Sequence, residues 1–332
     1  MTAAAAAQRQ PPRAGITGKP WWPWLKRAAT LLFFGLVAWL LVEQGRAIEW
    51  DEVLTALRAY PTALLAGAVA LAALSFVLYS CFDLVGRHYT GHALRAPTVM
   101  LVTFISYIFN LNLGSLVGGV AFRYRLYSRL GLDTATITRV LSLSMLTNWT
   151  GYLLLGGLVF TFATPDLPPD WKIGSGGLQI LGGVLLAAVS IYLLLCAFSP
   201  RRSLQVRGHA VDLPSGRMAL LQVVMGAANW LIMSSLVFLL LQQQVALPAV
   251  AGVLLVAAVA GVLAHVPAGL GVLEAVFVAL LSHQIPVHQL LAALVAYRVI
   301  YYLVPLAIAT LVYLVIETRA KRLAPTAPAA TP

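Results

Sequence analysis

The fold of this chain depends on the segment Val266-Pro267-Ala268-Gly269-Leu270-Gly271-Val272-Leu273-Glu274, where a proline, two glycines and a carboxylate interrupt a long apolar region. Proline removes a backbone donor and glycine weakens a helix, so helical hydrogen bonding is predicted to fail here. At membrane depth, unpaired backbone is tolerated only inside protein or beside a water-filled cavity. An acidic side chain there costs about 2.5–3.5 kcal/mol to insert and usually has a function. The segment is therefore predicted to form part of a substrate-binding site, with Gly269, Gly271 and Glu274 contributing.

The composition is that of a protein with many membrane-spanning helices. Of the 332 residues, 60% are hydrophobic and only 10% are charged, too little charge to cover a water-soluble protein of this length. The net charge of +11 comes from basic residues in short loops between apolar segments. This distribution follows the positive-inside rule and is not that of a nucleic-acid-binding surface. Cys81 and Cys196 lack the spacing of a metal or redox site, and we interpret both as packing residues.

Apolar segments that are long enough to cross a bilayer recur along the chain. Full spans are predicted at 28–42, 61–82, 140–163, 176–198, 218–241 and 289–316. The first is short enough to be a signal-peptide core, but no clear small-residue cleavage site follows it, so we favour an uncleaved span. Residues 1–27 and 317–332 are predicted to be disordered cytoplasmic tails, so both termini are expected on the inner side of the membrane.

A second interrupted segment, 98–119, has poor helix composition in its second half. That half contains Asn110, Asn112, Gly114, Gly118 and Gly119. If 98–119 crossed the membrane fully, the arginines within 123–139 and 201–217 would lie outside. If it instead dips in and returns, and 249–283 dips in from the other side, most of the 22 basic residues lie inside. The positive-inside rule favours this second topology.

The predicted fold class is an all-α polytopic membrane protein with six full spans and two re-entrant broken segments. Residues 28–163 and 176–316 each contain two spans, a re-entrant segment and a further span, and they begin on opposite sides. These are predicted to be inverted-topology repeats, which in transporters place the substrate site at their interface. The alternative is that glycine and proline are simply frequent in membrane helices, but two breaks in matching positions favour a transport site.

A single arginine, Arg298, lies in the middle of the last predicted span beside tyrosines that include Tyr301. An arginine at this depth needs an anionic partner, and its fork suits a carboxylate or a phosphate. Glu274 and a lipid phosphate are the two candidates. Glu274 either meets a cationic group or couples a proton, or it pairs with Arg298 for a structural reason. We predict that Glu274, Arg298 and Tyr301 contact substrate.

Other polar residues at membrane depth are weaker candidates. Arg123 and the arginine two residues after it cannot share a helix face, so one of them can point into the site, and both can equally be anchors at the inner surface. Asn110 and Asn112 are predicted substrate contacts, although interhelical hydrogen bonding explains most such side chains. Asp83 with Arg87 forms either an ion pair or a gate.

Motifs of enzymes are absent from the sequence. It contains no Walker loop, no HExxH motif and no nucleophile elbow with a plausible base. Its glycine-rich places lie within apolar segments and not between a strand and a helix, so a nucleotide site is not expected. We predict a protein that is not an enzyme, with no catalytic residue, cofactor or metal.

Three ordered motifs carry a family resemblance. They are Gly118-Gly119-Val-Ala-Phe-Arg123-Tyr-Arg125, the opening segment from Pro267 to Glu274, and Tyr297-Arg298-Val-Ile-Tyr301-Tyr302-Leu-Val-Pro305, with Asp83-Leu-Val-Gly86-Arg87 as a shorter match. They resemble the lysylphosphatidylglycerol synthase transmembrane-region family over most of 30–316. That family includes the flippase part of the multiple peptide resistance factor and stand-alone inner-membrane proteins. The resemblance implies movement of an aminoacylated phosphatidylglycerol from the inner to the outer leaflet.

The chain also departs from the family pattern. Family members that synthesise the aminoacylated lipid carry a large soluble domain after the membrane part, and this chain ends sixteen residues after its last predicted span. It is therefore not expected to synthesise lysyl-lipid. Ala268 stands where glycine is commoner in the family, a small change in a segment that can still turn.

With this resemblance, the predicted function is that of a bacterial inner-membrane lipid translocase. Its cargo is predicted to be a phospholipid, which can be aminoacylated, or a lipid linked to polyprenyl phosphate. The headgroup is predicted to pass through a polar cavity between the two broken segments. The alternative is a non-catalytic membrane subunit that anchors or regulates a soluble lipid-modifying enzyme. A membrane-embedded transferase is disfavoured because no acid/base pair with a donor-binding loop is visible. Expected partners are a membrane lipid and no nucleic acid. A soluble lipid-modifying enzyme and a second copy of the chain are further partners that this interpretation allows.

Overall fold

A computed structural model describes residues 50–163, 175–199, 203–206, 209–264, 266 and 269–323. The predicted first span at 28–42 and the tail at 1–27 lie outside these residues, as do Pro267 and Ala268 of the opening segment. All statements below concern the part of the chain from residue 50 onward.

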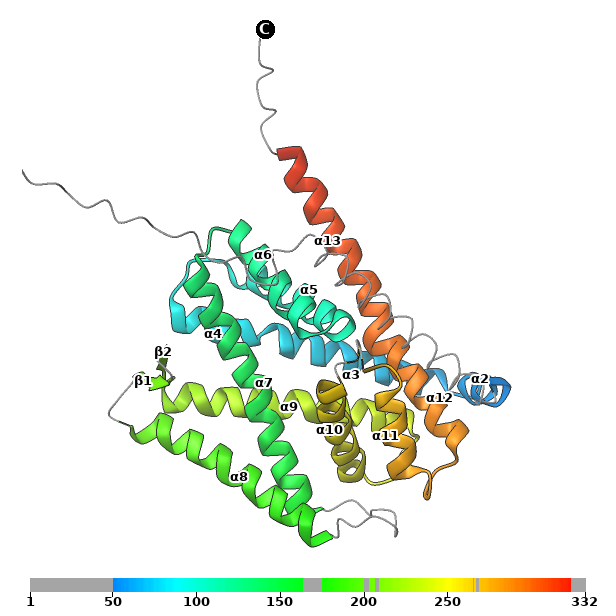
Figure 1. Cartoon of the computed structure of the whole chain (residues 1–332). Coiled ribbons are helices and arrows are strands. Elements are labelled where there is room, and N and C mark those ends of the chain that lie inside the picture. Colours follow the sequence, from blue (N-terminus) through cyan, green and yellow to red (C-terminus); the bar gives the residue numbers. More distant parts are fainter. Residues whose placement is uncertain are drawn as a thin grey trace, which may run out of the picture. The chain divides into compact units, whose positions relative to one another are not determined.

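The described chain is all-α except for one short hairpin (Figure 1). Its helices are α2 (Trp50–Arg58), α3 (Thr62–Ser80), α4 (Phe82–Thr90), α5 (Ala96–Leu113), η2 (Ser115–Ala121), α6 (Phe122–Arg129), α7 (Thr134–Phe162), α8 (Ser175–Phe198), α9 (Gly216–Leu240), α10 (Leu247–Ala264), α11 (Val272–Leu281), α12 (Val287–Arg298), η4 (Val299–Leu303) and α13 (Val304–Leu323). Seven of the described helical segments are long and apolar enough to cross a membrane. The prediction of an all-α polytopic membrane protein is confirmed.

Two details at the predicted inner side differ from expectation. The last helix continues to Leu323, so the prediction of disorder from residue 317 is wrong for 317–323, whose composition favours a helix. Within the basic loop before α9, strands β1 (Ser203–Val206) and β2 (His209–Asp212) pair antiparallel. The residues of β1 alternate polar and apolar but those of β2 do not, so the sequence carries no clear period-two signal for the hairpin.

The first broken segment folds back on itself at Gly114. Its α5 arm ends there with φ 87°, a backbone conformation that favours glycine. The returning π-helical turn η2 then packs so closely on α5 that a Cβ on Gly118 would lie 2.1 Å from the carbonyl carbon and oxygen of Phe109. We call α5, η2 and α6 the first hairpin.

The second broken segment also reverses, between α10 and α11. Gly269 has φ 55° and Gly271 has φ 77°, and Gly271 is the N-cap of α11. The two arms lie side by side in Figure 1, and we call them the second hairpin. Helical hydrogen bonding therefore fails where the sequence predicted it. A chain reversal is what a re-entrant segment requires, while the depth of the hairpins in a membrane and the inverted repeat stay predictions.

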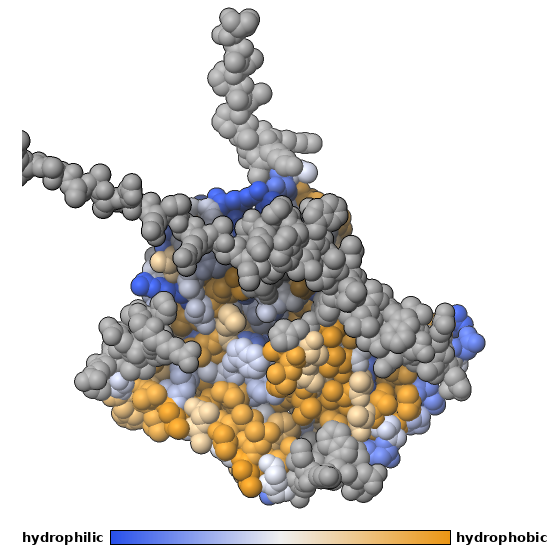
Figure 2. All heavy atoms as spheres, viewed as in Figure 1, coloured by the Kyte–Doolittle hydropathy of each residue, from blue (hydrophilic) through white to orange (hydrophobic). Residues whose placement is uncertain are grey.

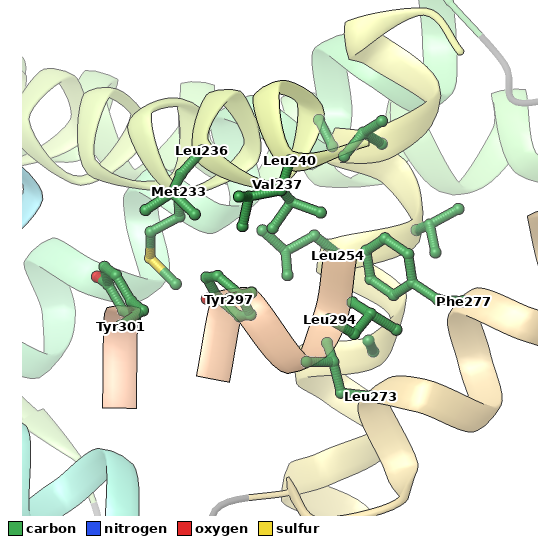
Figure 3. Close-up of a cluster of buried hydrophobic side chains, with 14 of the residues drawn as sticks. Met233, Leu236, Val237, Leu240, Leu254, Leu273, Phe277, Leu294, Tyr297 and Tyr301 are labelled. Carbon is green, nitrogen blue, oxygen red and sulfur yellow. The ribbon is translucent and has the colours of Figure 1, made fainter. Parts of the chain in front are cut away.

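Helix α9 is central to the packing, since it contacts α3, α7, α8, α10 and α12. It crosses α7 at Gly151 and Gly226, where a Cβ on Gly151 would lie 2.0 Å from the carbonyl carbon of Gly226. Small residues allow such close backbone approach in membrane bundles. Figure 3 shows Tyr297 and Tyr301 of the last helical segment reaching toward α9, where Met233 and Val237 face them. This packing builds one wall of the candidate site.

The outward faces of the helices are apolar. Figure 2 shows hydrophobic side chains over much of the lower part of one face. On α8, for example, Ile180, Val184 and Ile191 are exposed. In water each such side chain would forgo about 1.5–3 kcal/mol of burial free energy, whereas lipid tails accept it. The surface is therefore suited to a bilayer.

Candidate functional site

A cavity of about 490 Å³ lies between the turns of the two hairpins. Asn110, Gly114 and Ser115 of the first hairpin line it, and Gly261 and Gly269 of the second hairpin line it as well. Helices α3, α7, α9 and α12 and the π-helical turn η4 complete the wall. The two segments that the sequence singled out thus meet around one space.

Aromatic side chains dominate this cavity, which we call the aromatic cavity. Its rings are Tyr79, Tyr107, Trp149, Tyr152, Trp230, Tyr297 and Tyr302. Its other polar lining residues include Asn110, Ser115 and Asn148, and no Asp, Glu, Lys, Arg or His is among the described residues that line it. The charged side chains nearest the cavity, Glu274 and Arg298, are paired with one another beside it, and their predicted contact with substrate stays a prediction.

Glu274 and Arg298 form an ion pair beside the aromatic cavity. Arg298 Nε and Nη2 both donate to the Glu274 carboxylate, the second at 2.9 Å, and Nη2 also donates to the Gly269 carbonyl at 2.9 Å. The Arg298 guanidinium lies 5.5 Å from the ring centroid of Tyr302, within cation–π range. Arg298 thus ties the turn of the second hairpin to the last helix. Of the two anionic partners considered from sequence, the structure pairs it with Glu274.

Asp83 and Arg123 form a second ion pair, and it is fully buried. Arg123 Nε donates to Asp83 Oδ2 at 3.0 Å and Nη2 donates to Oδ1 at 3.3 Å. Arg123 also donates to the Gly119 carbonyl and to Ser144 Oγ, each at 3.3 Å, and Tyr127 donates to Asp83 at 2.9 Å. Every charged oxygen and most donors of the pair are satisfied, which is the condition under which a buried pair is tolerated.

The predicted pair of Asp83 with Arg87 is wrong. Arg87 Nε instead donates to the Leu94 carbonyl at 2.6 Å, where it closes the turn after α4. Asp83 lies four residues before Arg87 on the same helix, a spacing that permits a pair, but the side chain of Asp83 is buried toward α6 and α7. Burial of Asp83 against Arg123 therefore decides its partner, and the alternative of a gate stays a prediction.

The two pairs share one arrangement. In each hairpin an arginine binds a carboxylate and also a glycine carbonyl of the hairpin itself, Gly119 for Arg123 and Gly269 for Arg298. A helix break leaves carbonyl groups without helical partners, and a guanidinium has enough donors to bind such a group and a carboxylate together. Arg298 therefore ties the turn of the second hairpin to α12, and Arg123 ties the returning arm of the first hairpin to α4.

Tyr301 lies behind the cavity wall and not in it. Its hydroxyl is within hydrogen-bond distance of Ser75 Oγ at 2.7 Å and of the Tyr107 hydroxyl at 3.2 Å. Ser75 Oγ also donates to Asn229 Oδ1 at 2.8 Å, so the network joins α3, α5, α9 and η4. This agrees with the interhelical role expected of asparagines at this depth.

The other predicted contacts divide into two groups. Asn110 and Gly269 line the aromatic cavity, whereas Asn112 donates to the Ile108 carbonyl of its own helix at 2.9 Å and Gly271 caps α11. Sequence reasoning missed most of the ring lining. Its signal was the number of tyrosines and tryptophans in the middle of apolar segments, where such rings are rarer than at the membrane interface.

A family model described as the lysylphosphatidylglycerol synthase TM region matches residues 27–309. The match includes both hairpins, both ion pairs and the whole lining of the aromatic cavity. This chain belongs to that family. The resemblance inferred from the three motifs is confirmed, and those motifs lie at the two hairpins and at η4.

Three relatives illustrate the membership. The chain is 47% identical over 305 residues to inner membrane protein YbhN of Escherichia coli K12, covering 92% of this chain and 96% of that protein. It is 31% identical over 265 residues to the uncharacterized protein slr0712 of Synechocystis, covering 79% and 82%. It is 24% identical over 290 residues to phosphatidylglycerol lysyltransferase of Staphylococcus haemolyticus, covering 85% of this chain and 32% of that enzyme. The family member described here is thus a multi-pass membrane protein.

Proposed function

We propose that this protein is a flippase-like lipid translocase, in which a phospholipid headgroup passes between leaflets through the aromatic cavity. The observation that carries the proposal is the position of that cavity between two hairpin turns, each held by an arginine–carboxylate pair. The relationship to a protein named phosphatidylglycerol lysyltransferase supports an aminoacylated phosphatidylglycerol as the first candidate cargo. On this proposal the protein translocates the lipid and does not synthesise it.

The volume of the aromatic cavity fits a headgroup. Small-molecule sites typically measure about 300–1,000 Å³, and a cavity of about 490 Å³ is within that range. Two acyl chains would not fit beside the headgroup, so on this proposal they stay in the bilayer while the headgroup crosses. The apolar outer faces of the helices support this division.

The lining favours a headgroup that carries an ammonium group. Faces of tyrosine and tryptophan attract cations, by about 0.5–1 kcal/mol at exposed sites and about 2 kcal/mol when desolvated. Two of the rings, Tyr297 and Tyr302, come from the last helical segment, and Trp230 comes from α9. No described basic residue lines the cavity, so a bare polyprenyl phosphate is the less favoured cargo.

The lipid phosphate is assigned to Arg298. Arg298 donates to the carbonyl of Gly269, and Gly269 lines the cavity. The guanidinium therefore lies directly behind a residue that the cargo would contact. Its side chain is 13% exposed and that of Glu274 is 22% exposed, which leaves room for exchange of partners. A phosphate that enters would replace Glu274 on Arg298, and Glu274 would then meet the ammonium group or a proton. Arg123 has no such freedom, and we assign it a structural role.

Lipid movement in vesicles tests the proposal. Purified protein is reconstituted with lysylphosphatidylglycerol in the inner leaflet, and its arrival outside is followed with an impermeant amine-reactive reagent. Tyr302→Leu is expected to slow movement about tenfold, since tenfold corresponds to about 1.4 kcal/mol, within the range of one desolvated cation–π contact. The matched control is Phe162→Leu, an aromatic side chain that is 76% exposed and outside the cavity.

Two results would overturn the proposal. One is equal movement in vesicles with and without protein. The other is equal movement for the wild type and the Glu274→Gln, Arg298→Ala double variant, which would reject the assigned roles of that pair. Phosphatidylglycerol without its lysyl group serves as the comparison cargo. Its movement is expected to be slowed less by Tyr302→Leu than that of the lysyl lipid, because it has no ammonium group, although the Tyr302 ring also contacts Arg298.

A further inference from the structure

A second cavity, of about 500 Å³, lies between α4 and the first turns of α9. Its lining residues are Cys81, Leu84, Val85, His88, Ser215, Arg217, Met218, Leu221 and Met225. It shares no lining residue with the aromatic cavity, and none of its residues was assigned a role above. We call it the α4–α9 groove.

Each helix presents one face to the α4–α9 groove. On the α4 side the lining residues recur at Cys81, Leu84, Val85 and His88, the spacing of one helical face. On α9, Met218, Leu221 and Met225 recur in the same way. Because most of these side chains are apolar, the interior of the groove suits a hydrocarbon chain.

The groove has a histidine and an arginine at one end. The α3–α4 segment runs antiparallel to α9, since Tyr60 donates to the Leu240 carbonyl and Ser75 to Asn229. His88 near the end of α4 therefore lies at the same end of the groove as Arg217 near the start of α9. The apolar residues Leu84, Leu221 and Met225 extend from there toward the middle of the spans.

That end of the groove coincides with the ends of two candidate spans, Thr62–Thr90 and Gly216–Leu240. Lipid phosphates lie at this level of a bilayer, and acyl chains lie deeper. His88 and Arg217 are both exposed, and neither has a hydrogen-bond or ion-pair partner among the described residues. No described acid lines the groove, because the nearest one on α4, Asp83, is buried against Arg123.

We propose that the α4–α9 groove binds an anionic phospholipid, with its phosphate against Arg217 and His88 and one acyl chain along Leu84, Leu221 and Met225. A basic pocket between membrane helices on the predicted cytoplasmic side is a recurring site for anionic headgroups. The end of the groove with Arg217 and His88 lies at the level of the lipid phosphate, and its apolar part lies at the depth of the acyl chain. The groove therefore suits both parts of an anionic phospholipid. The site is separate from the aromatic cavity, so it does not depend on the proposed translocase function.

Lipid titration of the purified full-length protein tests the site. Delipidated protein in detergent is titrated with phosphatidylglycerol and, separately, with phosphatidylcholine, and bound lipid is counted by native mass spectrometry. The Arg217→Gln, His88→Gln double variant is expected to weaken phosphatidylglycerol binding about tenfold, because the arginine–phosphate ion pair and a hydrogen bond from the His88 ring are lost. The matched control is Arg139→Gln, an exposed arginine on α7 that does not line the groove.

A second variant tests the part of the groove that is proposed to hold the acyl chain, and the native thiol of Cys81 reports whether lipid occupies the groove. Leu221→Trp adds bulk at a position that is 52% exposed, so it is expected to fill the groove and weaken binding of both lipids without unfolding the protein. Cys81 lines the groove and is partly exposed, while Cys196 is buried. Phosphatidylglycerol is therefore expected to slow maleimide labelling of Cys81 in the wild type, and less so in the double variant.

Three results would overturn the inference. Equal loss of binding in Arg139→Gln and in the double variant would mean that net charge, and not the groove, attracts the lipid. Protection of Cys81 by inorganic phosphate as strong as that by phosphatidylglycerol would identify a site for a soluble anion. Unchanged binding in Leu221→Trp would place the lipid elsewhere on the surface.

Discussion

The first hairpin holds its ion pair away from solvent, with the Arg123 side chain 3% exposed and the Asp83 side chain 0% exposed. The second hairpin leaves Arg298 13% exposed and Glu274 22% exposed. Both arginines bind a carboxylate and a glycine carbonyl of their own hairpin. The two ion pairs thus have the same chemistry but differ in how far solvent can reach them.

A buried, fully hydrogen-bonded pair cannot exchange partners cheaply, because either ion left alone would remain desolvated. Asp83 has three donors on it and Arg123 reaches four acceptors, so the first hairpin is fixed to α4 and α7. Water or a headgroup can approach the Glu274–Arg298 pair, and either can replace a partner at lower cost. The comparison therefore supports an anchoring role for the first pair, and on the proposed function the second pair is the one that contacts the lipid.

The largest expected effect is that of breaking the buried pair. Asp83→Asn removes the charge that compensates Arg123 and is expected to lower the free energy of unfolding by about 3–5 kcal/mol. Glu274→Gln is expected to cost less, about 1–3 kcal/mol, because water can reach Arg298. Chemical unfolding of the purified proteins measures both values.

The control for these carboxylates is Asp133→Asn at the N-cap of α7. Asp133 accepts from the Thr136 backbone N–H at 3.0 Å, and asparagine caps a helix about as well as aspartate, so stability is expected to change little. A larger loss for Glu274→Gln than for Asp83→Asn would reverse the assignment of roles.

The two turns are expected to respond differently to an added methyl group. At Gly118 a Cβ would lie 2.1 Å from the Phe109 backbone, so Gly118→Ala must move one arm of the first hairpin and is expected to cost about 3 kcal/mol. At Gly269 a Cβ meets open space, and Gly269→Ala adds only the strain of a φ of 55°, about 1–2 kcal/mol.

Thermal unfolding of the glycine variants measures this difference. The matched control is Gly183→Ala on α8, where a Cβ meets nothing within 4 Å and φ is helical, so a gain of about 1 kcal/mol is expected. Equal losses for the two hairpin variants would show that backbone strain, and not close packing, dominates in both turns.

Much of the fold was predictable because a bilayer imposes length and charge rules on the sequence. The predicted spans at 176–198 and 218–241 coincide within two residues with α8 and α9, and both broken segments contain a glycine turn. The span at 140–163 begins earlier, at Thr134, because Asp133 caps a helix whose polar first turns lie beyond the predicted apolar segment.

The site was less predictable, since its partners come from distant parts of the chain. The pair of Glu274 with Arg298 could be proposed because each was isolated in an apolar segment. The pair of Asp83 with Arg123 joins residues forty positions apart, and the spacing of Asp83 and Arg87 on one helix pointed to the wrong partner. The number of tyrosines and tryptophans in apolar segments could not locate the cavity, because a ring at membrane depth packs equally well in a core or around a cavity.

The smallest effect concerns a feature found at the first hairpin, where Arg129 donates to both carboxylate oxygens of Glu317 on α13 and Arg125 Nη2 lies 3.4 Å from Glu317 Oε1. These arginines are about half exposed and solvent screens the contact, so Arg129→Gln is expected to lower the stability of the protein only slightly. Unfolding at about 0.01 M and about 1 M salt checks this, since the Debye length falls from about 30 Å to about 3 Å and the loss should nearly vanish. Arg125→Gln, at the longer contact, is the matched control and should cost less. A large, salt-independent loss would mean that α13 clamps the first hairpin through this contact, so that anchoring of that hairpin could no longer be assigned to Asp83 and Arg123 alone.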